Sequence, residues 1–317
     1  MGSKGERVVS EREAAIRAAL ESGVPRECVE SDACRWGGLL ASIDGYSASE
    51  SMLPWMTWRD WGWKAAVASA SDVAASGGRP RALLVSLGVP RPEVGVEIAR
   101  GVGEAASWMG ALVLGGDFNS CNCDAWVDVA VVGEELYWSP RWAAKPGDLL
   151  VRAGPLGYGA VALALLRDPR LASVIPKRVL DYIRRPKPPL RLPEELAARG
   201  CIPHAAIDNS DGWSETLWLL AEASGATLAL ESINGSEELA GLLSELYGGV
   251  ESAVLLSAED YTMLLAVNAD QAGCVLDSCK SAGVECEIIG RVEGEGVGVI
   301  YRGRRVPRVG WDSFRRA

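Results

Sequence analysis

The stretch from Ser42 to Gly77 decides how this chain folds. It begins Ser42-Ile43-Asp44-Gly45 and ends Lys64-Ala65-Ala66-Val67-Ala68-Ser69-Ala70-Ser71-Asp72-Val73-Ala74-Ala75-Ser76-Gly77. The apolar run 39–43 predicts a short strand that delivers Asp44 at its end. The run 65–75 is small and apolar, which favours a buried helix, and it contains a single carboxylate, Asp72. Because an unpaired buried charge is costly, Asp72 is expected to have a partner.

Two further aspartates follow apolar runs in the same way as Asp44. Asp117 comes after Leu112-Val113-Leu114-Gly115-Gly116, and Asp208 comes after Ala205-Ala206-Ile207. We interpret these acids as meeting at one site that divalent metal holds together, because Mg²⁺ prefers carboxylate and phosphate oxygens. The alternative is that they are helix caps and turn residues, for which aspartate is also well suited.

Composition indicates a globular protein of about two domains. The chain has 317 residues, of which 48% are hydrophobic and 23% are charged. Its net charge of -10 argues against binding to a nucleic-acid backbone or to an anionic membrane surface. No apolar run approaches the roughly 20 residues of a membrane helix. No charged-then-apolar leader opens the chain, so we expect a cytoplasmic protein.

The eight cysteines and the single histidine, His204, limit the kinds of metal site and catalytic triad that the chain can form. Paired C-x-x-C spacing is missing and Cys121-Asn122-Cys123 is C-x-C, so a zinc site would have to be almost all thiolate. We expect buried free thiols or an occasional disulfide instead. A Ser-His-Asp triad would have to use His204, which follows Pro203 in a predicted turn, and a structural role is favoured. The P-loop and protein-kinase motifs are absent.

Helices and strands are predicted in both halves of the chain, which indicates two α/β or α+β domains. The turn Lys145-Pro146-Gly147-Asp148 places the boundary between domains 1–142 and 143–317. Glycines at 154, 157 and 159 lie between a strand and a helix, where they could cradle phosphate or simply allow tight packing. Predicted strands are 39–43, 82–89, 111–114, 127–132, 149–153, 205–208, 227–230, 261–267, 285–290 and 297–301. Predicted helices are 10–21, 61–76, 92–108, 160–166, 194–198, 213–223, 236–247 and 269–282.

Seven short motifs, in this order, resemble those of the thiamine-monophosphate kinases, a family in the superfamily of aminoimidazole ribonucleotide synthetase. They are Ser42-Ile43-Asp44, the run 64–75 with Ser71-Asp72, Gly115-Gly116-Asp117, Arg141 before Lys145-Pro146-Gly147-Asp148, Ile207-Asp208-Asn209-Ser210-Asp211-Gly212, Glu259-Asp260-Tyr261 and Gly310-Trp311-Asp312-Ser313-Phe314. The resemblance covers nearly the whole chain.

This resemblance implies a fold, a reaction and a set of partners. The fold would be an N-terminal α/β domain whose strands pair across a homodimer into a barrel, followed by a C-terminal α+β domain. The enzyme would phosphorylate thiamine monophosphate to thiamine diphosphate, using ATP and several Mg²⁺ ions bound between the domains.

The resemblance also implies roles for individual residues. The metal ligands would be Asp32, Asp44, Asp72, Asp117, Asp208 and Asp211, with a backbone oxygen from Ser42 or Ile43. The nucleotide contacts would be Gly116, Asp117, Arg141 and Ser210, and the acceptor contacts would be Ser51, Glu259 and Trp311. Asp44, Asp72, Asp208 and Arg141 would carry catalysis.

Departures from the family pattern leave alternatives open. Glu30-Ser31-Asp32 stands where the family has Gly-Asp-Asp, and Ser51 stands where the family has a substrate-contacting His. A kinase or ATP-dependent synthetase of the same superfamily that acts on another small phosphorylated acceptor is therefore the first alternative. A non-catalytic nucleotide-binding paralogue is the second. Trp55, Trp58, Trp61 and Trp63 are expected to pack, at a dimer surface or elsewhere, unless one of them stacks on a ligand.

Overall fold

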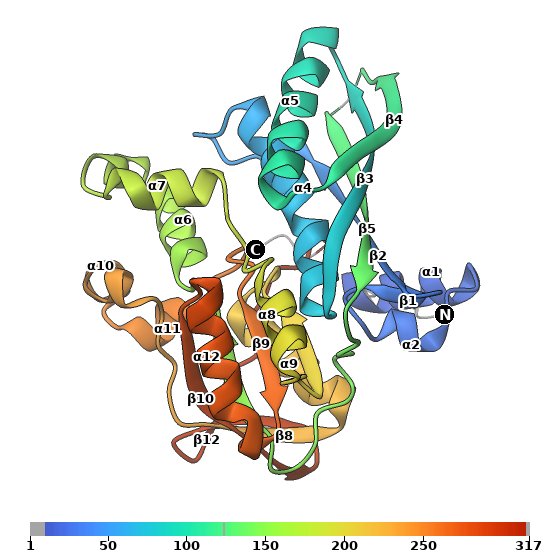
Figure 1. The fold of residues 1–317 in the computed structure, drawn as a ribbon. Helices are drawn as coiled ribbons and strands as arrows, with labels where there is room; N and C mark the ends of the chain where they lie inside the picture. The colour runs from blue at the N-terminus through green and yellow to red at the C-terminus, as the bar shows by residue number, and fades with distance from the viewer. Residues whose placement is uncertain (1–9, 123, 315–317) are drawn as a thin grey trace, which may run out of the picture.

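The computed structural model describes residues 10–122 and 124–314, which form two β-sheets with their helices (Figure 1). The N-terminal sheet has the strand order β1-β2-β5-β3-β4, and the C-terminal sheet has the order β12-β11-β8-β10-β6-β9-β7. The predicted mixed α/β and α+β class is confirmed. Within these residues one chain forms no closed barrel. No described helix combines the length and the apolar character that crossing a bilayer requires.

The predicted elements occur in the predicted order, most with bounds shifted by a few residues, and several short helices and strands that were not predicted join them. The N-terminal half contains α1 (Glu11–Glu21), α2 (Arg26–Val29), β1 (Cys34–Trp36), β2 (Leu39–Ser47), α3 (Ala48–Ser51), α4 (Trp58–Ala75), β3 (Gly78–Val89), α5 (Pro92–Met109), β4 (Leu112–Ser120) and β5 (Trp126–Glu135). The C-terminal half contains β6 (Leu149–Ala153), α6 (Tyr158–Arg167), η1 (Pro169–Ser173), α7 (Lys177–Arg184), α8 (Leu192–Arg199), β7 (Ala205–Asp208), α9 (Trp213–Ser224), β8 (Ala226–Leu230), η2 (Glu237–Leu239), α10 (Ala240–Tyr247), α11 (Val250–Leu255), β9 (Met263–Val267), η3 (Ala269–Gln271), α12 (Ala272–Ala282), β10 (Cys286–Glu295), β11 (Gly298–Tyr301) and β12 (Arg304–Arg305).

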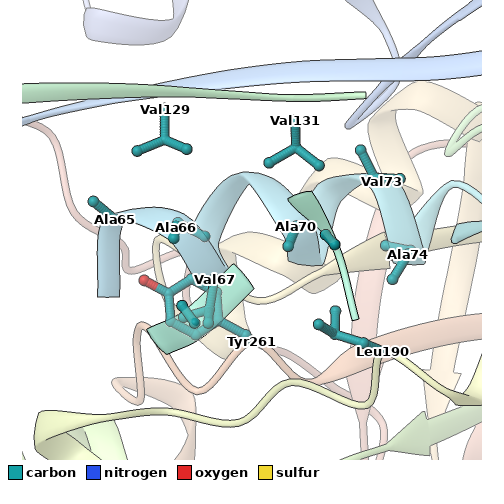
Figure 2. Packing of buried hydrophobic residues seen from close by; sticks show 14 of the residues in the cluster. Ala65, Ala66, Val67, Ala70, Val73, Ala74, Val129, Val131, Leu190 and Tyr261 are labelled. Carbon is teal, nitrogen blue, oxygen red and sulfur yellow. The ribbon is translucent and has the colours of Figure 1, made fainter. Parts of the chain in front are cut away.

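Helix α4 is the centre of the structure, because it is buried along almost its whole length. Its N-terminus is fixed by a capping box in which Thr57 and Asp60 satisfy each other's backbone N–H groups. Figure 2 shows Val129 and Val131 of β5 on one side of the helix and Leu190 and Tyr261 of the C-terminal half on the other. A helix that is apolar all round is one that is buried all round. The N-terminal core and one face of the C-terminal sheet therefore form a single continuous core.

Helices α4 and α5 cross so closely that glycine is required at the contact. A Cβ atom on Gly101 would lie 1.9 Å from the carbonyl oxygen of Arg59, and one on Gly62 would lie 2.1 Å from that of Ile98. Both obstacles are backbone atoms, which cannot rotate away. The two helices cover one face of the N-terminal sheet (Figure 1).

The opposite face of the N-terminal sheet is open and apolar. Ile43 of β2, Leu84 of β3 and Leu112 of β4 all expose their side chains, by 67%, 48% and 68%. Strand β4 is also an edge strand, so one row of its backbone groups has no strand partner among the described residues. Contiguous apolar surface of this kind marks an interaction site.

The glycine-rich turn before α6 is filled by the protein itself. The backbone N–H groups of Gly157 and Gly159 donate to the two carboxylate oxygens of Asp260, each at 2.9 Å. A Cβ atom on Gly159 would also lie 1.8 Å from the carbonyl oxygen of Ala258. Of the two interpretations of this turn, tight packing is the one that the structure supports.

The expectation of buried free thiols is wrong for the described cysteines. Disulfides join Cys28 to Cys34, Cys201 to Cys274 and Cys279 to Cys286, and Cys121 is also disulfide-bonded. Cys123 lies outside the described residues. The expected structural role of the single histidine is confirmed, since His204 Nδ1 lies 2.8 Å from a carboxylate oxygen of Asp148 in the turn between the two halves.

Candidate functional site

Strand β2 presents Ser42 and Asp44 to α4, while the residue between them faces away. Successive strand side chains point to opposite faces, so Ile43 lies on the open face of the sheet. The Ser42 hydroxyl donates to Asp72 Oδ2 at 2.5 Å. The backbone N–H of Asp44 donates to Ser69 Oγ at 2.9 Å. Asp44 lies in the middle of β2, not at a strand end as predicted, because β2 continues to residue 47.

Three of the predicted metal ligands come together from different parts of the chain. Asp32 precedes β1, Asp72 lies in α4, and Asp208 ends β7. Each offers a carboxylate oxygen within 4.8 Å of the others. Asp32 Oδ2 also accepts a hydrogen bond from the backbone N–H of Asp208 at 3.1 Å. The cluster therefore lies at the junction of the two halves.

Arg141 supplies positive charge to this cluster. One of its Nη atoms donates to Asp32 Oδ1, and its side chain is largely buried. One guanidinium cannot neutralise three carboxylates. Moreover, Asp208 Oδ2 and the hydroxyl of Ser71 are both buried, and neither makes a hydrogen bond within the described chain. Three converging carboxylates, one of which has an oxygen without a hydrogen-bond donor, offer the oxygen ligands that a hard divalent cation prefers.

The same geometry raises the pKa values of the acids. Burial is the main cause for Asp32, Asp44, Asp72 and Asp208, and the pKa values of Asp72 and Asp208 are raised well above the ordinary value. Repulsion among these carboxylates raises the pKa of Asp72 further, whereas Arg141 partly offsets the rise at Asp32. Burial, followed by the charges of nearby glutamates, raises the pKa of Asp211 to about 7. Bound cations would favour the ionised forms of these acids.

These raised pKa values predict that the cation-free protein loses stability as pH rises. The unfolded carboxyls ionise near pH 4, whereas in the folded protein Asp211 retains its proton up to about pH 7, and Asp72 and Asp208 retain theirs well above the unfolded range. In that window the native state binds more protons than the unfolded state, so the free energy of unfolding falls with rising pH. Thermal unfolding in EDTA should therefore give a lower midpoint at about pH 8 than at about pH 5.5.

The Asp72→Asn variant and added cation are the controls for this prediction. Either should reduce the difference between the two pH values, because each removes repulsion that the ionised cluster suffers. A midpoint that stays constant or rises in EDTA over this window would contradict the prediction.

A cleft of about 900 Å³ opens onto this cluster. Its walls include α1, Arg141, Ser210, Asp211 and the segment 308–312 with Trp311. Helix α1 has no buried side chain and is held over the cleft by polar contacts, Arg12 to Glu222 and Glu11 to Ser313. A second cleft of similar volume, between α5 and the connector 187–191, contains none of the predicted site residues.

Asp117 does not join the cluster within one chain. It pairs with Ser86 of β3, Ser86 pairs with Asp128 of β5, and Asp128 pairs with Gly45 of β2. Cross-strand neighbours share a face, so Asp117 points to the same side as Gly45 and away from the side of Asp44. Three strand spacings of about 4.8 Å, some 14 Å in all, also separate β4 from β2.

Gly116, predicted to contact nucleotide, has a packing role in the same strand. A Cβ atom there would lie 1.8 Å from the carbonyl oxygen of Val85 in the neighbouring strand β3. The requirement for glycine is therefore explained without a ligand, and the nucleotide contact stays a prediction.

The three predicted acceptor residues lie in different surroundings. Ser51 is buried: its hydroxyl donates to Ser47 O at 2.8 Å and accepts from Trp61 Nε1 at 2.9 Å. Trp311 is exposed, and its backbone N–H donates to Asp211 O at 2.9 Å. The pocket role of each residue stays a prediction.

Glu259 is held in a strained loop that is tied to the turn after β7. Its φ is 59° and that of Tyr261 is 53°, both in the left-handed region that non-glycine residues rarely adopt. The backbone N–H of Glu259 donates to Ser210 O at 2.9 Å, which ties this loop to the turn after β7. Backbone strain of this kind is concentrated at functional sites.

Sequence reasoning did not select Lys64, which holds Glu259 in place. The Lys64 side chain is almost fully buried, and Nζ lies 2.6 Å from Glu259 Oε1 and 2.9 Å from Ser51 O. The ammonium also lies over the ring of Tyr46, 5.5 Å from its centre. A lone charge at the start of a small, apolar helical run is the same signal that drew attention to Asp72, and it could have identified Lys64.

The sequence matches one protein family over most of its length. Residues 31–134 match the N-terminal domain of AIR synthase related proteins, and residues 145–302 match the C-terminal domain. The predicted domain boundary at 142–143 falls between the two matched ranges.

Individual relatives share one description. The chain is 32% identical over 286 residues to the thiamine-monophosphate kinase of Pyrobaculum calidifontis, covering 90% of each chain. It is 30% identical over 323 residues to the thiamine-monophosphate kinase of Pyrococcus abyssi, covering 97% of each chain. Among solved structures it is similar to one described as AaThiL complexed with AMPPCP and TMP, with a TM-score of 0.80, 25% identity, and coverage of 98% of this chain and 100% of that one.

Proposed function

The chain belongs to the thiamine-monophosphate kinases among the AIR synthase related proteins, and from this premise we propose that it transfers the terminal phosphoryl group of ATP to thiamine monophosphate, giving thiamine diphosphate. The observation that carries the proposal is the cluster of Asp32, Asp72 and Asp208 with Arg141 at the cleft. Near neutral pH and above, bound cations relieve the repulsion within such a cluster, and the substrates of this reaction arrive with cations.

The protein needs to supply little covalent chemistry for this reaction. The acceptor's phosphate oxygen is already anionic near neutral pH, so it can attack the γ-phosphoryl group without a general base. The difficulty is to bring two polyanions together and to stabilise the charge of the transferring group. This is consistent with a site that is rich in carboxylates and contains no histidine among the described residues that line it.

The carboxylates are proposed to hold Mg²⁺, which would neutralise phosphate charge and align the two reacting groups. Asp32, Asp72 and Asp208 would be the central ligands, with Asp44 and Asp211 beside them. Ser42 already serves as a donor to Asp72, so a cation contact from this segment would come from a backbone oxygen of Ser42 or Ile43.

Arg141 and the turn after β7 are proposed to face the nucleotide. Arg141 is anchored by Asp32 and lies in the wall of the cleft, where its guanidinium can pair with phosphate oxygens. Ser210 lies in the same wall. Glu259 and Trp311 flank this region and would contact the acceptor, while the buried Ser51 would act through the loop that carries it.

Turnover by the purified protein tests this function directly. ADP and thiamine diphosphate should appear together when ATP, Mg²⁺ and millimolar thiamine monophosphate are all present. ADP release that does not depend on thiamine monophosphate would indicate another acceptor. Binding of AMPPCP without any turnover would indicate a non-catalytic nucleotide-binding protein.

The open face of the N-terminal sheet supports a homodimer. Two copies of this apolar face, with their edge strands, are self-complementary about a two-fold axis. Asp117, which cannot reach the cluster within its own chain, lies on that face and could serve the site of a second copy.

We place the enzyme in the cytoplasm.

The dimer can be tested by mass in solution. Sedimentation equilibrium should give about 67 kDa, twice the 33.6 kDa of one chain. Ile43→Arg would place a charge on the open face and should produce monomers with little turnover. Arg100→Ala on the exposed surface of α5, outside this face, should leave the dimer intact. An active wild-type monomer at micromolar concentration would contradict the proposal.

A further inference from the structure

A disulfide closes a small ring around one of the proposed metal ligands. Cys28 and Cys34 are six residues apart and are joined through their sulfur atoms. Asp32 lies inside this ring, two residues before Cys34. The other two disulfides whose pairing is described, Cys201–Cys274 and Cys279–Cys286, lie in the C-terminal half. The ring around Asp32 is therefore the one of the three that is positioned to affect the cluster.

The backbone of this segment has little regular structure, although Ala33 is buried in the N-terminal core. Helix α2 is only four residues long, and β1 is a three-residue edge strand that pairs with β2 alone. One buried hydrogen bond, from the N–H of Ala33 to Ser76 Oγ at 3.0 Å, links the segment to the end of α4. The disulfide joins the end of α2 to the start of β1. It therefore links two very short elements across the loop that carries Asp32.

The contacts of the Asp32 side chain cannot replace this covalent restraint. Both carboxylate oxygens are already engaged, Oδ1 by Arg141 and Oδ2 by the N–H of Asp208. A cation that takes Asp32 as a ligand competes with these donors for the same oxygens. The position of the carboxylate at that moment depends on the backbone of the ring.

We propose that the Cys28–Cys34 disulfide is a positioning element of the cation site, which holds Asp32 against Asp72 and Asp208. This inference rests on the proposed metal-binding role of the cluster. It goes beyond that role by assigning part of the cation affinity to a covalent link outside the ligand set. Outer groups that orient metal ligands typically contribute ten- to a hundredfold in metal affinity.

Titration with Mn²⁺ alone, followed by electron paramagnetic resonance, measures this contribution without requiring turnover. Cys28→Ser/Cys34→Ser should weaken Mn²⁺ binding by about tenfold or more. The matched control is Cys279→Ser/Cys286→Ser, which opens a ring of similar size, with a sequence separation of 7, at the junction of α12 and β10. The control should bind Mn²⁺ with an affinity close to that of wild type, because the Cys279–Cys286 disulfide orients none of the proposed ligands.

A double-mutant cycle distinguishes an effect of the disulfide on the position of Asp32 from a general loss of rigidity in the protein. In an Asp32→Asn background the ligand is already lost, so opening the ring should cause little further loss of Mn²⁺ affinity. If the double serine variant fails to fold, a dithiol can open the ring in the wild-type protein, being oxidised to its own disulfide as Cys28 and Cys34 become thiols. Because the other disulfides are reduced as well, the loss of Mn²⁺ affinity on reduction must be larger in wild type than in Asp32→Asn, and reoxidation should restore Mn²⁺ binding.

The outcomes distinguish this inference from the proposed function. Wild-type Mn²⁺ affinity in the Cys28→Ser/Cys34→Ser variant, or an equal loss in the control variant, would overturn the role of the disulfide while leaving the metal site in place. If wild type itself binds no Mn²⁺, the metal site and the positioning role are both overturned. A loss of Mn²⁺ affinity in Cys28→Ser/Cys34→Ser, without a similar loss in Cys279→Ser/Cys286→Ser, supports the inference.

Discussion

Replacing Asp72 with asparagine is expected to lower kcat by about a thousandfold or more, since the charge stabilisation that Mg²⁺ supplies is worth several kcal/mol. Asp72 is central to the cluster: it lies within reach of Asp32 and Asp208 and receives the hydroxyl of Ser42. Asparagine has nearly the same shape, so the fold should be kept. The measurement is kcat at saturating ATP and thiamine monophosphate across a Mg²⁺ titration.

The same substitution should raise the unfolding temperature of the cation-free protein near pH 8. Burial and repulsion from Asp44, Asp208 and Asp32 disfavour the ionised form of Asp72, and asparagine removes that conflict. Asp60→Asn in the same helix is the control: it weakens the capping box and the ion pair with Arg185, so it should lower stability and leave kcat nearly unchanged. Near-normal Mg²⁺-dependent turnover in Asp72→Asn would rule out the role assigned to Asp72.

Gly101→Ala is expected to have the largest effect on stability, lowering the free energy of unfolding by about 3 kcal/mol or more. The added methyl group would lie 1.9 Å from the carbonyl oxygen of Arg59, so the crossing of α4 and α5 must widen. Widening displaces α4, and with it Asp72. Thermal and urea-induced unfolding measure the change, and cation affinity should fall together with stability.

Gly103→Ala is the matched control, two residues further along α5. A Cβ atom at Gly103 meets nothing within 4 Å. Alanine there should therefore raise stability, by about 0.5–1 kcal/mol, because glycine is unfavourable inside a helix. Equal effects of the two substitutions would show that helix propensity, and not the close crossing, decides the outcome.

The sequence was informative where a local pattern determines structure. The small apolar run that contains Asp72 predicted a buried helix, and the apolar run before Asp208 predicted a strand that ends at the site. The helix was predicted to begin at 61, but it begins at Trp58, because the capping box of Thr57 and Asp60 lies further upstream. Asp32, Asp72 and Asp208 do come together, as the resemblance to the family implied.

Other features depend on pairing between distant segments, which local patterns do not encode. Asp117 follows an apolar run just as Asp208 does, yet strand register places it on the far face of the sheet. Cysteine spacing did not reveal that Cys28 pairs with Cys34. The contact of Lys64 with Glu259 joins residues from opposite halves of the chain, so only the assembled fold shows it.

The burial of α4 between the two halves has a consequence for motion during the catalytic cycle. Opening the cleft by a hinge between the sheets would expose the apolar side of α4 that packs on Leu190 and Tyr261, at a cost of about 25 cal/mol for each Å² exposed. Lifting α1 breaks polar contacts that water can replace. Substrates are therefore expected to reach the cluster when α1 swings aside, while the two sheets keep their relative positions.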